Sequence, residues 1–180
     1  MVYNYKEVYK KYGSAYQINK AVKEQKIYKI DSGIYSDKEN NHYLEVFTKK
    51  YLDAIISGDS AYYYHNLTDV IPAKIFITTK RNATRYKDKH IKQSYSEDKY
   101  FSIGKTIINY EGVNINIYDK ERMLIELAKN KNNIPYDYYK EIINNYRKIK
   151  DELDIFKIED YANAFPNSEK IMAIIQDEVF

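Results

Sequence analysis

The spacing of hydrophobic residues predicts two short helices at the beginning of the chain. In residues 4–12 the apolar side chains recur at helical intervals, with Gly13 following as a stop signal, and the stripe consists of Tyr5, Val8, Tyr9 and Tyr12. Ser14, with Gln17 three residues later, has the pattern of a capping box and starts a second helix. The inward stripe of this helix is expected to hold Ala15, Ile18, and Ala21 or Val22.

After Gln25 the pattern changes to one typical of strands. Residues 27–30 and 34–35 flank a turn at Asp31-Ser32-Gly33 and predict a short β-hairpin. The order helix, tight turn, helix and hairpin is that of a minimal winged helix-turn-helix domain. Residues 40–50 then predict a connecting helix. We place the first domain at residues 1–48 and the second at residues 49–180.

The second domain mixes strand and helix signals. We expect a buried strand at 54–57 that enters a helix through Gly58, a strand at 74–79, a loop or strand extension at 80–92, an apolar segment at 100–103, and a hairpin at 106–117. Asp119 and Pro135 are good starts for two helices, and two more follow beyond residue 155. The predicted fold class is α+β: an N-terminal winged helix-turn-helix followed by a C-terminal domain with a small mixed sheet and several helices.

Composition restricts the chemistry that the chain can perform. Among 180 residues there is no cysteine and only three histidines, which excludes thiolate metal sites and cysteine nucleophiles and leaves little for a zinc site. No apolar run approaches the roughly 18 residues that a membrane span requires, and the first residues lack the apolar core of a signal peptide. We therefore expect a cytoplasmic protein with no metal, no cofactor and no membrane association.

One segment contains the residue types of a nucleophilic triad, namely Ser60, His65 and Asp69. At about 100° per residue, Ser60 and His65 point to different faces of a single helix and cannot act as nucleophile and base. A packed or capping histidine is the favoured interpretation. The chain also lacks the glycine-rich phosphate loops and the zinc-protease motif. We assign no catalytic residue and expect that the protein is not an enzyme.

Charge is distributed unevenly along the chain. Residues 1–50 carry a net charge of +4 and residues 71–110 one of +6, whereas residues 51–70 and 111–180 are acidic, at −3 and −4. Basic zones attract phosphate groups through Coulomb steering and counterion release. A solvated lysine face is the alternative interpretation of either zone.

Both basic zones supply candidate binding residues. Gln and Asn on the outer face of a recognition helix can pair with adenine, and Lys can contact phosphates or guanine. The expected DNA-binding residues are Ser14, Tyr16, Gln17, Asn19, Lys20, Lys23, Lys26 and Lys29. In the second zone, a basic surface would bind a phosphate-bearing species or an acidic partner, with a solubilising loop as the alternative. It comprises Lys80, Arg81, Arg85, Lys87 and Lys89.

The order of these landmarks resembles the AbiEi abortive-infection antitoxins over nearly the whole chain. The most specific segments are Ser57-Gly58-Asp59-Ser60-Ala61 and His65-Asn66-Leu67-Thr68-Asp69. The resemblance continues through weaker matches at Tyr12-Gly13 to Ile18, Val22, Gln25-Lys26-Ile27, Gly33-Ile34-Tyr35, Ile75-Phe76-Ile77-Thr78 and Asp119-Lys120-Glu121-Arg122.

The resemblance implies an antitoxin of a type IV toxin-antitoxin system, acting in phage defence. Its winged helix-turn-helix would bind inverted repeats in double-stranded operator DNA and repress its own operon, and its C-terminal domain would be needed for antitoxicity. The toxin would be a nucleotidyltransferase that is countered without a stable complex. The sequence departs from the family in the wing, where Asp31-Ser32 stand at positions that usually include Arg, so that Lys26 and Lys29 would supply the phosphate contacts.

A second hypothesis belongs to another class of protein. In it the chain is a protein-interaction module that does not bind DNA, and the first two helices serve only as a docking domain.

Overall fold

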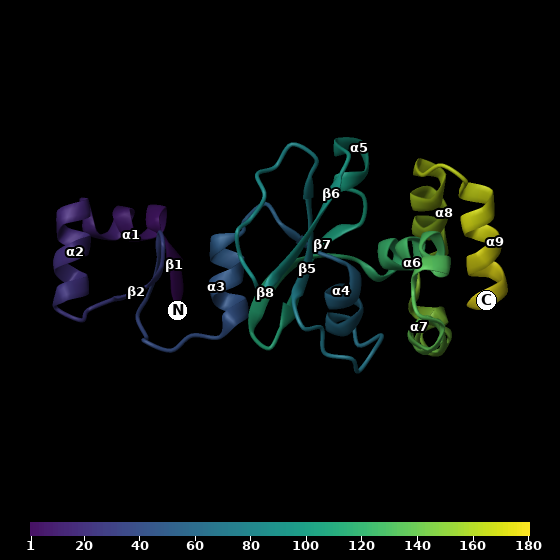
Figure 1. The fold of residues 1–180 in the computed structure, drawn as a ribbon, viewed down its shortest axis with the longest axis horizontal. Coiled ribbons are helices and arrows are strands. Elements are labelled where there is room, and N and C mark those ends of the chain that lie inside the picture. The colour runs from purple at the N-terminus through teal and green to yellow at the C-terminus, as the bar shows by residue number, and fades with distance from the viewer. The chain divides into compact units, whose positions relative to one another are not determined.

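The computed structural model describes residues 1–180 and divides them into two compact units, which both contain helices and strands (Figure 1). Unit 1 comprises Met1–Asp53 and Asn109–Ile115, and unit 2 comprises Ala54–Ile108 and Asn116–Phe180. The first stretch of unit 1 thus extends to residue 53, and its second stretch comes from the middle of the chain. None of the helices combines the length and the hydropathy that crossing a membrane requires.

Unit 1 is built from a three-stranded antiparallel sheet and three helices. Its elements are β1 (Val2–Asn4), α1 (Tyr5–Tyr12), α2 (Ala15–Lys23), β2 (Tyr28–Asp31), β3 (Ile34–Ser36) and α3 (Tyr43–Lys50). The strand order is β1-β3-β2, so the second strand of the predicted hairpin lies at the centre of the sheet. The two helices, the hairpin and the connecting helix agree with the sequence prediction. Strand β1 was not expected.

Local capping explains why α1 and α2 are separate helices. Gly13 ends α1 with φ 79°, a left-handed conformation that glycine adopts without steric cost. The Ser14 Oγ then accepts a hydrogen bond of 3.2 Å from the backbone N–H of Gln17. The complete, reciprocal capping box belongs to α1, where Asn4 and Glu7 each accept a hydrogen bond from the other's backbone N–H.

The core of unit 1 holds one face of α2 against α1 and the sheet. Its members are Val8, Ile18, Ala21, Ile27 and Tyr35. Ala15 was expected to face inward but is exposed, because α2 presents Ile18 and Ala21 to the core and leaves its first turn in solvent.

Unit 2 contains a five-stranded mixed sheet in the order β6-β5-β4-β8-β7. The strands are β4 (Ile55–Ile56), β5 (Ile75–Lys80), β6 (Ile91–Ser96), β7 (Lys105–Tyr110) and β8 (Val113–Tyr118), of which the hairpin tip 109–115 is assigned to unit 1. Strand β4 pairs antiparallel with β5 and parallel with β8, and β5 pairs parallel with β6.

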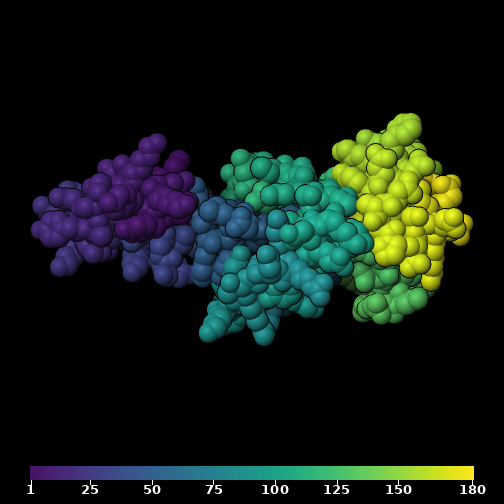
Figure 2. Space-filling view, turned by 90° about the horizontal axis from the view of Figure 1, so that it is seen from above, coloured from purple at the N-terminus to yellow at the C-terminus, as the bar shows by residue number.

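Helices α4 (Gly58–Tyr64) and α5 (Asp98–Phe101) pack against β5, and four longer helices form the C-terminal part of unit 2. The longer helices are α6 (Lys120–Lys129), α7 (Tyr136–Lys148), α8 (Ile155–Ala164) and α9 (Ser168–Glu178), with short 3-10 turns η1 (Lys131–Asn133) and η2 (Lys150–Glu152). Helix α6 packs against α4, α8 and α9, and Figure 2 shows the side chains of α8 and α9 in one continuous mass.

Two expectations for unit 2 need correction, and one further segment acquires an element. The basic segment expected at 80–92 ends earlier, because Ile91 and Lys92 already belong to strand β6, whose backbone pairs with β5 in register Ile75 to Ile91. The apolar segment 100–103, to which the sequence assigned no element, completes α5 and a turn. The helix that begins at Gly58 was expected to continue through Leu67, but it ends at Tyr64, since Asn66 adopts φ 58° and turns the chain out of the helix.

Buried tyrosines join the elements of unit 2 through their hydroxyl groups. Tyr62 donates to the carbonyl of Met123 at 3.2 Å, and Tyr146 donates to that of Lys120 at 2.9 Å. Tyr118 donates to the carbonyl of Phe101 at 3.0 Å, and burial raises its pKa to about 12. These hydroxyl groups are therefore protonated donors near neutral pH, and part of the chain's tyrosine content serves the core.

Candidate functional site

The outer face of α2 carries exposed polar side chains that unit 1 does not use for folding. Tyr16 is 73% exposed, and Gln17, Asn19, Lys20 and Lys23 are exposed as well. Ile18 and Ala21 lie on the opposite side, in the core. The helix contains no acidic residue and its positive end is capped at Ser14. The structure thus gathers five of the eight predicted DNA-binding residues on one helix face.

The remaining predicted DNA-binding residues lie beside this face. Ser14 is the half-buried N-cap of α2, and Lys29 is an exposed residue of β2. Lys26 follows α2 and forms an ion pair of 2.7 Å with Glu24. Glu24 also lies 3.9 Å from Lys20, so one carboxylate at the end of α2 partly offsets two of the expected phosphate contacts.

The acidic side chains of residues 1–36 are all engaged by lysines. Glu24 pairs with Lys26, as described, while Glu7 and Asp31 receive Lys49 and Lys50 of α3 at 2.6 Å each. Burial raises the pKa of Glu7, but the hydrogen bonds from Lys49 and the Asn4 backbone outweigh it and hold the pKa below its usual value. Because these residues include seven lysines and only three acids, pairing leaves an excess of positive charge.

The predicted basic surface of the second domain lies on the loop between β5 and β6. Arg81, Arg85, Lys87 and Lys89 are exposed, and Lys80 ends β5 at 3.9 Å from Asp98. The Gln93 side chain of β6 holds the loop, since its Oε1 accepts from the Tyr86 backbone N–H at 2.8 Å and its Nε2 donates to the Thr84 carbonyl at 3.2 Å. The loop is therefore anchored at its centre with its cationic side chains in solvent.

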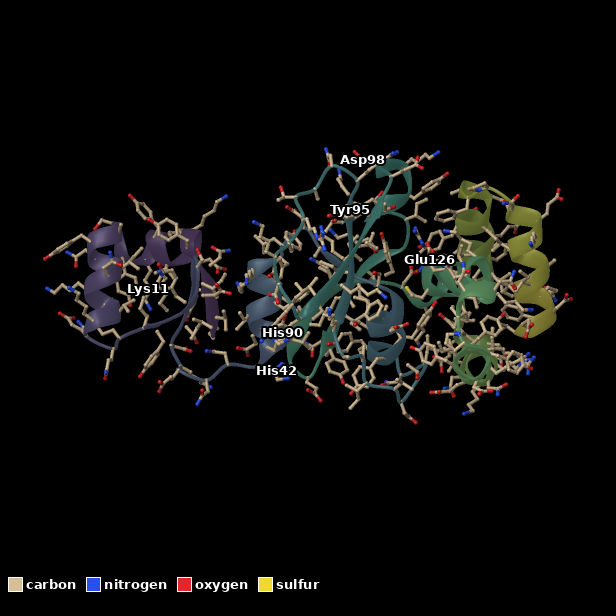
Figure 3. All side chains as sticks on the ribbon, in the orientation of Figure 1. Lys11, His42, His90, Tyr95, Asp98 and Glu126 are labelled. Atoms are coloured by element: carbon tan, nitrogen blue, oxygen red, sulfur yellow. The ribbon has the colours of Figure 1, made fainter.

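Unit 2 also contains a cleft of about 1060 Å³ that the sequence did not reveal. Its walls come from the β5 and β6 strands, from α4, and from α6, α7 and Phe165 after α8. Figure 3 labels two residues that line the cleft, Tyr95 on strand β6 and Glu126 on helix α6. Among the basic segment 80–92, only Lys92 reaches this cleft.

Arg122 lines the cleft and is almost completely buried, at 3% exposure. Its guanidinium donates twice to Glu126 Oε1, at 3.0 and 2.8 Å, and to the carbonyls of Tyr100 and Ile103, at 2.9 and 3.0 Å. The rings of Tyr118 and Phe165 lie 4.6 and 4.5 Å from it. With these donors occupied, Arg122 holds α5, α6 and α8 together and is not free to bind an anion.

A row of hydroxyl groups lies on the sheet face of the cleft. Thr78 Oγ1 donates to Ser57 Oγ at 2.9 Å and lies 2.9 Å from Ser94 Oγ, so the row runs from the residue after β4 across β5 to β6. Nearby, burial raises the pKa of Asp59, while the ammonium of Lys92 opposes the shift. Lys92 itself lies 4.5 Å from the ring centre of Phe76.

The residues that resemble a nucleophilic triad serve the fold. Ser60 Oγ donates to the Lys74 carbonyl at 3.2 Å and accepts from the Phe76 backbone N–H at 2.9 Å. His65 follows α4, and its Nε2 lies 2.7 Å from the Tyr118 carbonyl, to which it donates. Burial lowers the pKa of His65. The three side chains do not form a relay, as the helical spacing indicated.

The cleft was missed because its residues come from segments that are distant in the sequence. The hydroxyl row of Ser57, Thr78 and Ser94 takes one residue from each of three separate segments and therefore leaves no local pattern in the sequence. A scan against models of protein families found no match, and a search of curated proteins found no significant match either.

Proposed function

We propose that the chain is a DNA-binding antitoxin of a type IV toxin-antitoxin system, in which α2 enters the major groove of operator DNA as the second helix of a winged helix-turn-helix. The observation that carries the DNA-binding part is the outer face of α2. This face is exposed and polar, and α2 itself contains no acidic residue, while the opposite face of the helix packs into the core of unit 1. The antitoxin part rests on the resemblance to the AbiEi family.

In this proposal the side chains of α2 divide between base edges and phosphates. Gln17 and Asn19 carry the amide groups that pair with adenine, and Lys20 and Lys23 contact phosphates. The β2–β3 hairpin would act as a wing, and Lys29 on β2 is exposed for a phosphate contact. One short helix reads only a few base pairs, so a single copy would select its operator poorly. Two copies bound to inverted half-sites supply the selectivity, and the half-sites lie one or more DNA turns of about 10 base pairs apart.

The test is a salt titration of binding to duplex DNA from the region upstream of the chain's own gene. Replacing Lys20 and Lys23 together with Ala should reduce the slope of log K against log salt by about 2, because each lost phosphate contact releases about one counterion fewer. Lys150→Ala with Lys170→Ala is the matched control, since both lysines are exposed in unit 2. An unchanged slope in the folded α2 variant would remove α2 from the DNA interface.

A protein-interaction module is the second candidate, and one observation favours it. The first two helices expose the rings of Tyr5, Tyr9 and Tyr16 at 42%, 46% and 73%, and tyrosine is enriched in protein interfaces. A folded chain that binds no upstream DNA at low salt, with Tyr16→Ala abolishing capture of a protein partner, would favour this candidate.

A further inference from the structure

Strand β6 is an edge strand with one side open. It pairs with β5 and has no strand on its other side. Lys92, Ser94 and Tyr95 are exposed, whereas Gln93 is partly covered by the β5–β6 loop that its side chain holds. An edge strand presents unpaired backbone N–H and C=O groups that can accept a further strand. Its only buried residue is Ile91, at the beginning.

The open edge borders the cleft of unit 2. Every residue from Lys92 to Ser96 lines the cleft, together with Phe76 on the neighbouring strand and Tyr138 on α7. Pockets of about 300–1,000 Å³ hold drug-sized ligands, and this cleft is at the upper limit of that range. It therefore has room for several side chains of a peptide.

The mouth of the cleft is apolar on one side. Val70 and Ile71, in the loop between α4 and β5, line the cleft at 51% and 74% exposure, and Ile134 and Pro135 line it from the segment that precedes α7. Exposed apolar side chains gathered around a depression are typical of a binding surface. They would favour a partner that carries apolar side chains.

The charges of the cleft favour an acidic partner. The carboxylate of Glu126 is compensated by Arg122 and by Lys129, which lies 3.1 Å away. Glu97 pairs with Lys99 at 3.4 Å. Lys74 and Lys92 line the cleft and form no salt bridge. The ammonium of Lys92 nevertheless opposes the rise in the pKa of Asp59 that burial causes.

We propose that unit 2 binds an extended peptide segment of another protein, which adds to β6 as a sixth strand and carries both acidic and apolar side chains on the face that meets the cleft. The backbone of the segment would pair with the open edge of β6. Its apolar side chains would enter the cleft beside Phe76 and Tyr138, and its carboxylates would meet Lys74 and Lys92. This is the mode in which a peptide extends an exposed sheet edge. The proposal does not depend on DNA binding by unit 1.

The experiment selects peptides from a displayed library of random short sequences on the full-length chain. We expect enrichment of sequences in which acidic and apolar residues occupy every second position, because only these positions share the cleft face of the added strand. Charge reversal at Lys74 and Lys92 to Glu should weaken the binding of a selected peptide by at least about tenfold, because both charges then repel it. The matched control, Lys150→Glu with Lys170→Glu, changes the net charge equally at exposed positions outside the cleft and should leave binding unchanged.

Amide hydrogen exchange of the complex locates the peptide. Added strand pairing should slow the exchange of alternate amides between Lys92 and Ser96, whereas a peptide with N-methyl groups at alternate positions should no longer bind. Selection of no peptide, or equal binding to the two charge-reversal variants, would overturn the proposal. Protection of the β6 amides from exchange that increases with protein concentration in the absence of peptide would indicate self-association and would also overturn the proposal. Binding of single-stranded oligonucleotides but no peptide at β6 would do the same.

Discussion

Removing the guanidinium of Arg122 should destabilise unit 2 strongly. Arg122→Leu deprives the carbonyls of Tyr100 and Ile103 of their donor and removes both hydrogen bonds to Glu126. A buried acceptor without a partner costs about 1–3 kcal/mol, and breaking a buried ion pair costs about 3–5 kcal/mol in total. Because Lys129 remains beside Glu126, we expect a loss of about 3–4 kcal/mol. This is a large part of the roughly 5–15 kcal/mol that stabilises a typical domain.

The assay is urea denaturation followed by far-ultraviolet circular dichroism. Lys129→Met is the matched control, since it removes the other cation from Glu126 at a partly exposed site and should cost no more than about 1 kcal/mol. The double variant of Arg122→Leu with Glu126→Gln should be less destabilised than the sum of the single variants, because the two groups interact directly. A loss below about 1 kcal/mol for Arg122→Leu would refute the reasoning.

Three further predictions address glycine geometry, pH dependence and the basic loop. Gly104→Ala should lower the free energy of unfolding by several kcal/mol more than Gly112→Ala in the same denaturation assay. Both glycines have positive φ, but a Cβ at Gly104 would lie 2.3 Å from Arg122 Cβ, whereas a Cβ at Gly112 would have no atom within 4 Å. The free energy of unfolding should fall as pH decreases through and below 6.5, because burial lowers the pKa of His65 and the unfolded state then binds more protons than the folded state. His65→Gln should flatten this dependence on pH. An unchanged dependence would show that His65 is not its cause. The third prediction replaces Arg81, Arg85 and Lys87 of the basic loop together with Glu. This charge reversal should leave the melting temperature unchanged but abolish growth rescue of cells that express the cognate toxin. Full rescue with unchanged DNA binding would mean that the loop only aids solubility.

The elements with strong local signals could be predicted from the sequence. The stop at Gly13 and the cap at Ser14 need only the conformation of a few neighbouring residues, and both appear in the structure. The turn of the first hairpin at Gly33 and the cap of α6 at Asp119 are of the same kind. The outer face of α2 also followed from the sequence, because a helix of known start and inward stripe has a determined polar side.

Strands β1 and β6 were decided by tertiary structure. Residues 2–4 are too few to show a period, and they form a strand only because β3 lies beside them. Residues 91–96 contain one buried side chain, and their pairing with β5 joins residues 16 positions apart. Such pairing uses backbone groups that every residue has, so it leaves no hydrophobic pattern in the sequence.

The cleft and the role of Arg122 likewise depend on long-range packing. Arg122 lies on the first turn of α6, where the sequence suggests an exposed cation, but the chain brings the carbonyls of Tyr100 and Ile103 and the rings of Tyr118 and Phe165 around it. The sequence by itself therefore determined most of the helices, several of their caps, the first hairpin turn and the candidate DNA-binding face, which depend on neighbours along the chain. Only the tertiary structure decided the open edge of β6, the cleft beside it and the burial of Arg122, because these depend on which distant segments meet.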